Sequence, residues 1–224
     1  MNLWIIDPSL NRPEDQGVEE IRSCWIGESR LFRPVLAADG PGPDAGYDFD
    51  ALVLMGSAAS VYDTHDWLTA LRDWLRPILA GEVVRPTLGL CFGHQLIGEM
   101  AGARVDFLEP SKKKRVGVEE TRIDGSRLMP EATHLRVVVS HREAVVETPD
   151  HYLVTASRPG VPVDGLEHES LPVFSYQFHP EAREEFAGNA GIDEREIDDR
   201  LRADSRRVLD AFLTRAGGGR IQGL

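Results

Sequence analysis

The feature that most restricts the fold of this sequence is a cysteine that lies between two glycines, where a strand pattern changes to a helix pattern. The run 87–90 is short and mostly apolar, and apolar residues recur at helical spacing over 92–101. A side chain on such a tight turn is held in a strained backbone conformation, and the residues two positions away must be small. Gly89 and Gly93 satisfy this requirement. The pattern therefore predicts a nucleophile elbow that presents Cys91.

The helix expected after this cysteine would give its sulfur the environment that a nucleophile needs. Free N–H groups at a helix N-terminus and the positive end of the helix dipole favour thiolate over thiol. The backbone N–H of Phe92 faces the same position and is expected to donate to an oxyanion. The alternative for any cysteine is an inert, buried side chain, and this is our interpretation of Cys24.

Short apolar runs alternate with amphipathic patterns in the first half of the chain. We expect strands at 3–7, 31–36, 51–55 and 87–90, and helices at 14–29, 66–80 and 92–101. Pro77 should kink or shorten the second helix, and Gly81 should cap it. This alternation is typical of an α/β domain with a mostly parallel sheet that is flanked by helices.

The second half of the chain has a different pattern. Strands separated by short turns are expected at 116–123, 135–139, 144–147, 152–156 and 173–178, which indicates antiparallel or mixed pairing. A charged, amphipathic helix is expected at 193–215. With no repeat and no clear linker, residues 1–224 are interpreted as a single domain, in which the Gly-rich segment 216–224 is a flexible tail.

Charge and composition restrict the partners and the compartment. The formal net charge of −12 disfavours a nucleic acid or an anionic membrane as the main partner. Two cysteines in 224 residues make a disulfide scaffold implausible. The N-terminal segment lacks the features of a secretory signal, and no apolar run approaches the roughly 20 residues of a membrane helix. We expect a soluble, cytoplasmic protein without a cofactor, and without a metal site because no metal-ligand spacing is present.

A thiolate nucleophile needs a proton shuttle, and His179 is the strongest candidate. It follows the strand-like run 173–178, and side chains at strand ends point into the crevice where α/β sites lie. Pro180 fixes the direction of the chain, and Glu181 is near enough in sequence to reach the far ring nitrogen. The alternative is that this segment is only a surface loop.

Taken together, the two motifs make the sequence resemble the class I, triad-type glutamine amidotransferases, particularly the glutaminase domain of GMP synthase. That family carries a G-x-C-x-G-x-Q elbow, here residues 89–95, and a late F-H-P-E, here residues 178–181. The resemblance extends from Leu3 to about Arg183. It implies a flavodoxin-like α/β fold with a mixed, mostly parallel sheet.

The resemblance also implies roles for single residues. Cys91, His179 and Glu181 would form the catalytic triad. The backbone N–H groups of Ser57 and Phe92 would form the oxyanion hole. The substrate-binding residues would be Gly56, Gln95, Ser140, His141 and Arg142. The family usually has Gly-Gly-Pro at the oxyanion loop, whereas this chain has Gly56, Ser57 and Ala58, a change that affects the conformation expected for this loop.

The activity implied by the resemblance is acyl transfer from L-glutamine through a thioester, which gives glutamate and ammonia. The ammonia would pass to a separate synthase or ligase subunit, because the sequence contains no P-loop or Gly-rich ATP-pyrophosphatase loop. One alternative is a stand-alone γ-glutamyl hydrolase with the same triad. Another is a catalytically weak regulatory or binding protein, which only the altered oxyanion loop supports. The basic run 112–115 is either a solvated loop or a docking patch for an acidic partner.

Overall fold

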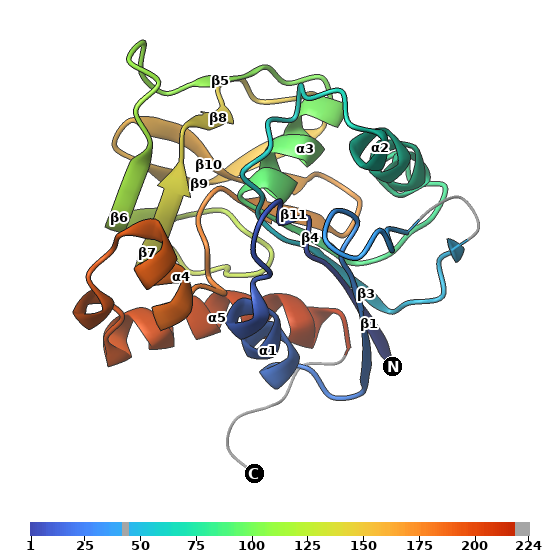
Figure 1. The fold of residues 1–224 in the computed structure, drawn as a ribbon, viewed down its shortest axis with the longest axis horizontal. Coiled ribbons are helices and arrows are strands. Elements are labelled where there is room, and N and C mark those ends of the chain that lie inside the picture. Colours follow the sequence, from blue (N-terminus) through green and yellow to red (C-terminus); the bar gives the residue numbers. More distant parts are fainter. Residues whose placement is uncertain (42–44, 218–224) are drawn as a thin grey trace.

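A single nine-stranded sheet organises the computed structural model, which describes residues 1–41 and 45–217. Its strand order within these residues is β2-β1-β3-β4-β11-β10-β9-β6-β7 (Figure 1). Helices cover both faces of the sheet (Figure 1). The expected α/β class with a mixed sheet is confirmed.

The first five strands in this order are parallel and form the centre of the fold. They are β2 (Glu28–Phe32), β1 (Asn2–Ile6), β3 (Ala51–Leu54), β4 (Thr87–Leu90) and β11 (Val173–Tyr176). Along β1, Leu3 and Ile5 pack into one apolar cluster, and Trp4 and Ile6 pack into another. Because both faces are covered, the strand is a continuous apolar run rather than an alternating one.

The remaining strands of the sheet pair in antiparallel fashion. They are β10 (Val161–His168), β9 (Tyr152–Arg158), β6 (Arg115–Ile123) and β7 (Thr133–His141). Although β7 lies at the end of the strand order, Val138 forms an isolated antiparallel bridge with His179, which follows β11. A separate two-stranded sheet pairs β5 (Val105–Phe107) with β8 (Glu143–Val145).

Two pairs of helices cover the parallel strands on opposite faces (Figure 1). One face carries α2 (Asp66–Leu79) and α3 (Phe92–Met100). The other carries α1 (Asp15–Ser23) and α5 (Asp199–Arg215). A shorter helix, α4 (Glu184–Ala190), and a 3₁₀ turn, η2 (Glu194–Glu196), lead from the strand region into α5. No helix in the described part of the chain has the length and apolar character that a membrane span requires.

Several expected boundaries were wrong. The second strand ends at Phe32, where its parallel register with β1 ends, rather than at residue 36. Pro34 lacks an N–H and could not extend the ladder. The helix expected from 193 begins only at Asp199, because the carboxylate of Asp198 caps it by accepting from Leu201 N. The first helix ends at Ser23 rather than 29.

Other expectations need smaller corrections. The strand expected at 144–147 is β8, which pairs with β5 and does not continue the main sheet. The strand expected at 173–178 ends at Tyr176. Strand β10 and helix α4 were not expected from the sequence. Pro77 lies inside α2, which ends two residues later at Leu79. Of the tail expected at 216–224, residues 218–224 lie outside the described residues.

Candidate active site

The turn between β4 and α3 places Cys91 at the carboxyl end of the parallel strands. Its backbone has φ 50° and ψ −99°, a conformation that L-residues rarely adopt. A Cβ on Gly93 would collide with the carbonyl oxygen of Leu54, and one on Gly89 would lie 2.6 Å from Ile97 Cδ1. Only glycine therefore fits on either side of this strained cysteine.

The histidine and the glutamate identified from the sequence form a buried pair next to this turn. His179 Nδ1 lies 2.8 Å from Glu181 Oε1, and the two residues are 4% and 2% exposed. The backbone N–H of His179 donates to Val138 O at 2.9 Å, which ties the segment to β7. Because Nδ1 is occupied by the carboxylate, Nε2 is the ring nitrogen that remains available to another group in the site.

The electrostatics of the site favour a protonated imidazole. Burial disfavours the charged form of His179, but the negative charges of Cys91 and Glu181 outweigh it and raise its pKa to about 10. A histidine that stays protonated at neutral pH can hold a neighbouring thiolate as an ion pair and later supply a proton.

The loop that begins at Gly56 lies directly against Cys91 and His179. A Cβ on Gly56 would lie 2.8 Å from His179 Cε1 and 3.5 Å from Cys91 Cβ. The Ser57 hydroxyl donates to Pro8 O at 2.7 Å and accepts from Ala59 N at 3.2 Å. The serine that departs from the family pattern is thus used to tie its loop to the segment after β1.

A cavity of about 680 Å³ opens at this position. Nine of the ten residues expected at the site line it: Gly56, Ser57, Cys91, Gln95, Ser140, His141, Arg142, His179 and Glu181. The tenth, Phe92, has its side chain in the core, and only its backbone was expected to take part. Within the described residues, no group of His, Cys, Asp and Glu side chains is arranged to hold a metal ion.

Comparison with known proteins identifies the family. The family model described as "Glutamine amidotransferase class-I" matches residues 38–197. The chain belongs to this family. One relative that this amidotransferase resembles is a subunit of the glutamine-hydrolyzing GMP synthase of Methanopyrus kandleri, 37% identical over 107 residues, which are 47% of this chain and 55% of the relative. The match to the GMP synthase of Ralstonia pickettii is 30% over 150 residues, or 62% of this chain and 26% of that protein.

The chain matches at most about half of the length of these curated relatives. Solved structures support the amidotransferase fold over nearly the whole chain. The crystal structure of a glutamine amidotransferase from Methylobacillus flagellatus superposes with a TM-score of 0.76 at 17% identity, covering 100% of this chain and 97% of the other. For a glutamine amidotransferase from Thermotoga maritima the TM-score is 0.73 at 16% identity, with 96% and 97% coverage.

Several residues of the amidotransferase site were not found from the sequence. Gln177 Nε2 lies 3.6 Å from Cys91 Sγ. Arg158 has no exposed side-chain surface and contacts His141 in the cavity wall. Gln177 could have been found from its position two residues before His179, since both would lie at the end of the same strand. Nothing in the local sequence around Arg158 indicates that it lies near the site.

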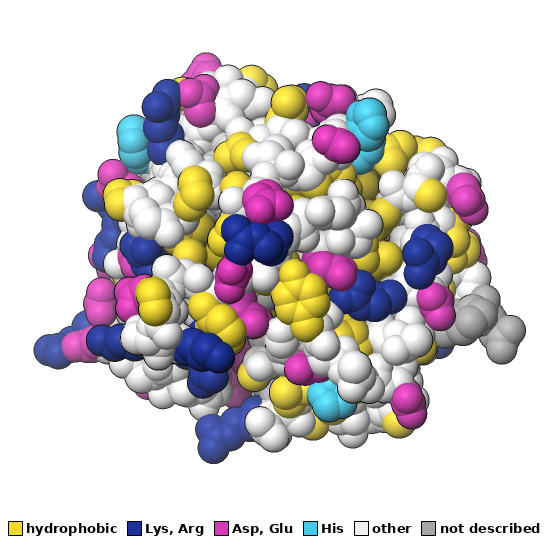
Figure 2. Space-filling model, turned by 90° about the horizontal axis from the view of Figure 1, so that it is seen from above, with side chains coloured by type: hydrophobic (Ala, Val, Ile, Leu, Met, Phe, Trp, Pro, Cys, Tyr) yellow, Lys and Arg dark blue, Asp and Glu magenta, His cyan; other side chains and the backbone are white. Residues whose placement is uncertain are grey.

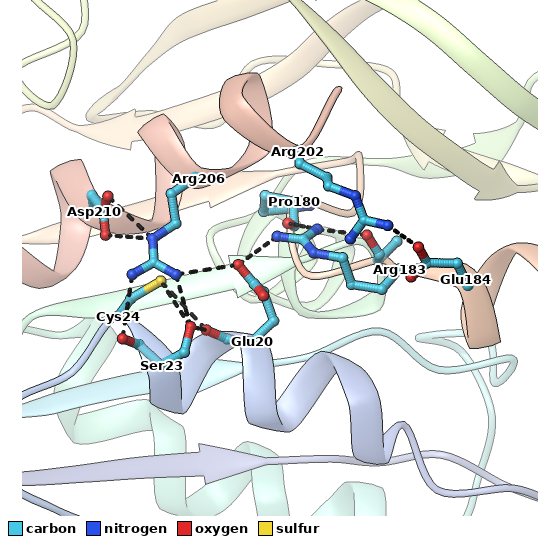
Figure 3. A network of polar contacts seen from close by, with 10 residues as sticks. Glu20, Ser23, Cys24, Pro180, Arg183, Glu184, Arg202, Arg206 and Asp210 are labelled. Carbon is cyan, nitrogen blue, oxygen red and sulfur yellow. Dashed lines mark hydrogen bonds and ion pairs between the residues drawn. The ribbon is translucent and has the colours of Figure 1, made fainter. Parts of the chain in front are cut away.

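A network of polar contacts fixes the segment that carries the histidine and the glutamate (Figure 3). Arg183 donates to the carbonyl oxygens of Pro180 and Ala182 at 3.1 and 2.6 Å. Its guanidinium also pairs with Glu20 of α1 at 2.5 Å. Arg206 of α5 lies 3.5 Å from the same carboxylate. Two helices are thereby connected to the backbone on either side of Glu181.

Cys24 borders this network (Figure 3). Its side chain is fully buried, and burial raises the pKa of its thiol to about 12. The thiol therefore stays protonated at neutral pH, which agrees with an inert cysteine.

Replacing Arg183 with methionine should lower both stability and turnover. The change leaves the carbonyls of Pro180 and Ala182 without their donor and Glu20 without its buried partner, so we expect a loss of about 2–4 kcal/mol. Chemical denaturation measures this loss, and the rate of ammonia release at saturating glutamine should fall about tenfold or more.

The matched control is Arg202→Met. Arg202 pairs with Glu184 beside the network but is 39% exposed, so its loss should cost less than about 1 kcal/mol. Equal effects of the two changes would contradict this function of Arg183.

Glu14, which lines the cavity, should make stability depend on pH. Burial and the nearby charge of Glu181 raise its pKa to about 7. A carboxyl whose pKa is higher in the folded than in the unfolded protein contributes its full stabilisation below the pKa of the unfolded protein, near 4.5. This stabilisation is lost as the pH rises through the pKa of the folded protein, about 7. Glu14→Gln should therefore match the wild type at pH 4.5 and be more stable at pH 8. Urea midpoints at both values measure this, with the exposed Glu131→Gln as control. A constant difference across the range would contradict the prediction.

The charges on the face seen from above are mixed. Figure 2 shows basic and acidic side chains interspersed with hydrophobic ones, and no large area of one sign. At the cavity itself, Arg12, Lys114 and Arg142 lie among acidic and neutral groups. Lys114 belongs to the basic run 112–115, so this run contributes to the rim of the cavity.

Proposed function

We propose that this amidotransferase hydrolyses the side-chain amide of glutamine with Cys91 as nucleophile, His179 as proton shuttle and Glu181 as the group that orients the shuttle. The observation that carries the proposal is the arrangement of the three residues. The cysteine lies on a strained elbow, the histidine is hydrogen-bonded to the glutamate at 2.8 Å, and all three line one cavity.

The reaction follows from these positions. The Cys91 thiolate attacks the amide carbon, and the oxyanion that forms accepts hydrogen bonds from backbone N–H groups, for which Phe92 and Ser57 are the candidates. His179 donates its proton to the amide nitrogen, the C–N bond breaks, and ammonia leaves. A water molecule, deprotonated by His179, then attacks the thioester, which releases glutamate and restores the thiolate.

The ammonia would serve a separate synthase subunit. This part of the proposal rests on the relatives whose names describe them as one subunit of GMP synthase, of which the chain matches about half. The size of the cavity is the one observation that supports the alternative function, a γ-glutamyl hydrolase with the same three residues. A volume of about 680 Å³ leaves room for a leaving amine larger than ammonia.

The proposal is tested with a glutamine-mimicking diazoketone electrophile and intact mass measurement. Wild-type protein should gain one adduct, excess glutamine should prevent it, and Cys91→Ala should gain none. A wild-type protein that remains unlabelled would favour the catalytically weak binding protein. Release of amine from γ-glutamyl amides, compared with ammonia release from glutamine, then decides between the two enzymatic functions.

A further inference from the structure

We propose that Gln177 is a further catalytic residue, whose side-chain amide donates a hydrogen bond to Cys91 Sγ and stabilises the thiolate, and that the buried Arg158 fixes the tautomer of His141, which anchors the carbonyl that orients Gln95 and, through it, this amide. The proposal rests on the proposed function, since it takes Cys91 as the nucleophile.

The contact with the sulfur comes from a fully buried side chain. Gln177 has no exposed surface, and its Nε2 lies 3.6 Å from Cys91 Sγ. Its Oε1 accepts a hydrogen bond from Gln95 Nε2 at 3.2 Å. Because the oxygen is turned toward Gln95, the NH₂ group is turned toward the sulfur. A donor aimed at a thiolate favours the charged form over the neutral thiol.

The orientation of Gln95 is fixed in turn by two oxygen atoms. Its Nε2 lies 2.6 Å from the carbonyl oxygen of Glu143 and 3.2 Å from Gln177 Oε1. The backbone carbonyl can only accept, so the Gln95 atom that faces it must be the NH₂ nitrogen, whose second hydrogen points to Gln177. Gln95 can therefore present only a donor to Gln177.

The carbonyl of Glu143 also accepts from a histidine in the cavity wall. His141 Nδ1 lies 2.9 Å from this oxygen, and His141 Nε2 lies 2.6 Å from an Arg158 guanidinium nitrogen. A guanidinium has no acceptor, so Nε2 must be unprotonated and Nδ1 must carry the hydrogen. Burial and the charge of Arg158 lower the pKa of His141 to about 3, which keeps this tautomer neutral throughout the working range of pH.

Arg158 is a suitable origin for such a chain because it is a buried, permanent donor. Its side chain has no exposed surface, and its guanidinium lies 3.3 Å from both Asp164 and Glu119. Asp164 is fully buried as well and accepts from the Thr121 hydroxyl at 2.6 Å. The guanidinium charge and the Cys91 thiolate also attract each other. A buried cation that is paired in this way stays in one position and donates in one direction.

The test is the pH dependence of Cys91 alkylation by iodoacetamide, followed by peptide mass. Gln177→Met removes the donor at nearly constant volume. We expect the inflection of rate against pH to rise by about one unit, alkylation at pH values below the inflection to slow about tenfold, and the plateau at high pH to remain. Gln16→Met, which changes an exposed glutamine of α1, should leave the profile unchanged. An unmoved inflection in Gln177→Met would overturn the proposal.

Arg158 is tested as a positioning residue by the charge-neutral pair Arg158→Met with Asp164→Asn. Its alkylation profile should shift in the same direction as that of Gln177→Met, and Arg158→Lys, which still donates, should shift less. A double variant with the wild-type alkylation profile would show that Arg158 does not help to position the Gln177 amide.

Two measurements on the wild-type protein do not depend on the folding of any variant. Nitrogen-15 NMR should show His141 protonated at Nδ1 only, and the Gln177 side-chain amide signals should move as the pH is varied. The opposite tautomer, or static amide signals, would overturn the proposal. Failure of the proposed function would be seen differently, as absence of glutamine hydrolysis. A protein without that activity could still show the shifted alkylation profile in Gln177→Met.

Discussion

Replacing Cys91 with serine should lower the rate of ammonia release from glutamine by about 10⁴-fold or more. Serine keeps the size of the side chain, but its hydroxyl is not ionised beside a protonated histidine. The pKa of His179 is raised to about 10 in large part by the negative charge of Cys91, which serine does not supply, so the ion pair that presents a charged nucleophile is lost. Steady-state ammonia release measures the loss, and an unchanged melting temperature would show that the fold is intact.

Cys24→Ser is the matched control for this experiment. Cys24 is fully buried and its Sγ lies 3.4 Å from Glu20 O, an acceptor that a serine hydroxyl can also use. Activity should therefore stay close to the wild-type value. If the Cys91 variant kept more than about a tenth of the wild-type rate, a cysteine nucleophile at this position would be wrong.

Replacing Gly93 with alanine should destabilise the fold by about 3 kcal/mol or more. The new Cβ would collide with the carbonyl oxygen of Leu54 on β3, which is a backbone atom, and the position of a Cβ is itself fixed by the backbone. No side-chain rotation can relieve such an overlap, so α3 would have to move away from the sheet. Urea denaturation measures the free energy of unfolding, and the reactivity of Cys91 should fall together with stability.

Gly188→Ala is the comparison for this change, since Gly188 also lies in a helix. A Cβ there would meet only the end of the Glu194 side chain, at 3.1 Å. Alanine favours a helix over glycine by up to about 1 kcal/mol, so this variant should be neutral or slightly stabilised. Similar losses for both glycines would show that the elbow is not the tightly packed turn described above.

The parts of the site that were predicted from the sequence are those specified by local spacing. The glycines on either side of Cys91 follow from the steric demands of one turn, and the bounds of β4 agreed with the prediction. The pairing of His179 with Glu181 also spans only two residues. Family resemblance added the other residues that line the cavity wall, most of which, such as Gly56 and residues 140–142, lie far from the elbow in the sequence.

The remaining features depend on contacts that no local pattern records. Arg158 at the end of β9 contacts His141 at the end of β7, and these two strands are not consecutive in the sequence. Arg183 pairs with Glu20 of α1, a helix near the N-terminus. Strand β10 was missed because Pro162, Asp164 and Gly165 are poor strand formers. Gly165 is required there by its neighbours, since a Cβ would lie 2.8 Å from both Ala156 Cβ and Tyr176 Cδ1.

The bridge between Val138 and His179 has a consequence for how the two halves of the sheet depend on each other. Cys91 lies at the end of a strand of the parallel half, whereas His179 is bridged to the strand that ends the antiparallel half. The antiparallel strands must therefore curl round until the last one meets the chain that leaves β11. The contact where the sheet closes in this way lies at His179, so its partial opening would separate His179 from Cys91 before the protein unfolds. Hydrogen exchange at the His179 amide, which donates to Val138 O, would report the opening directly.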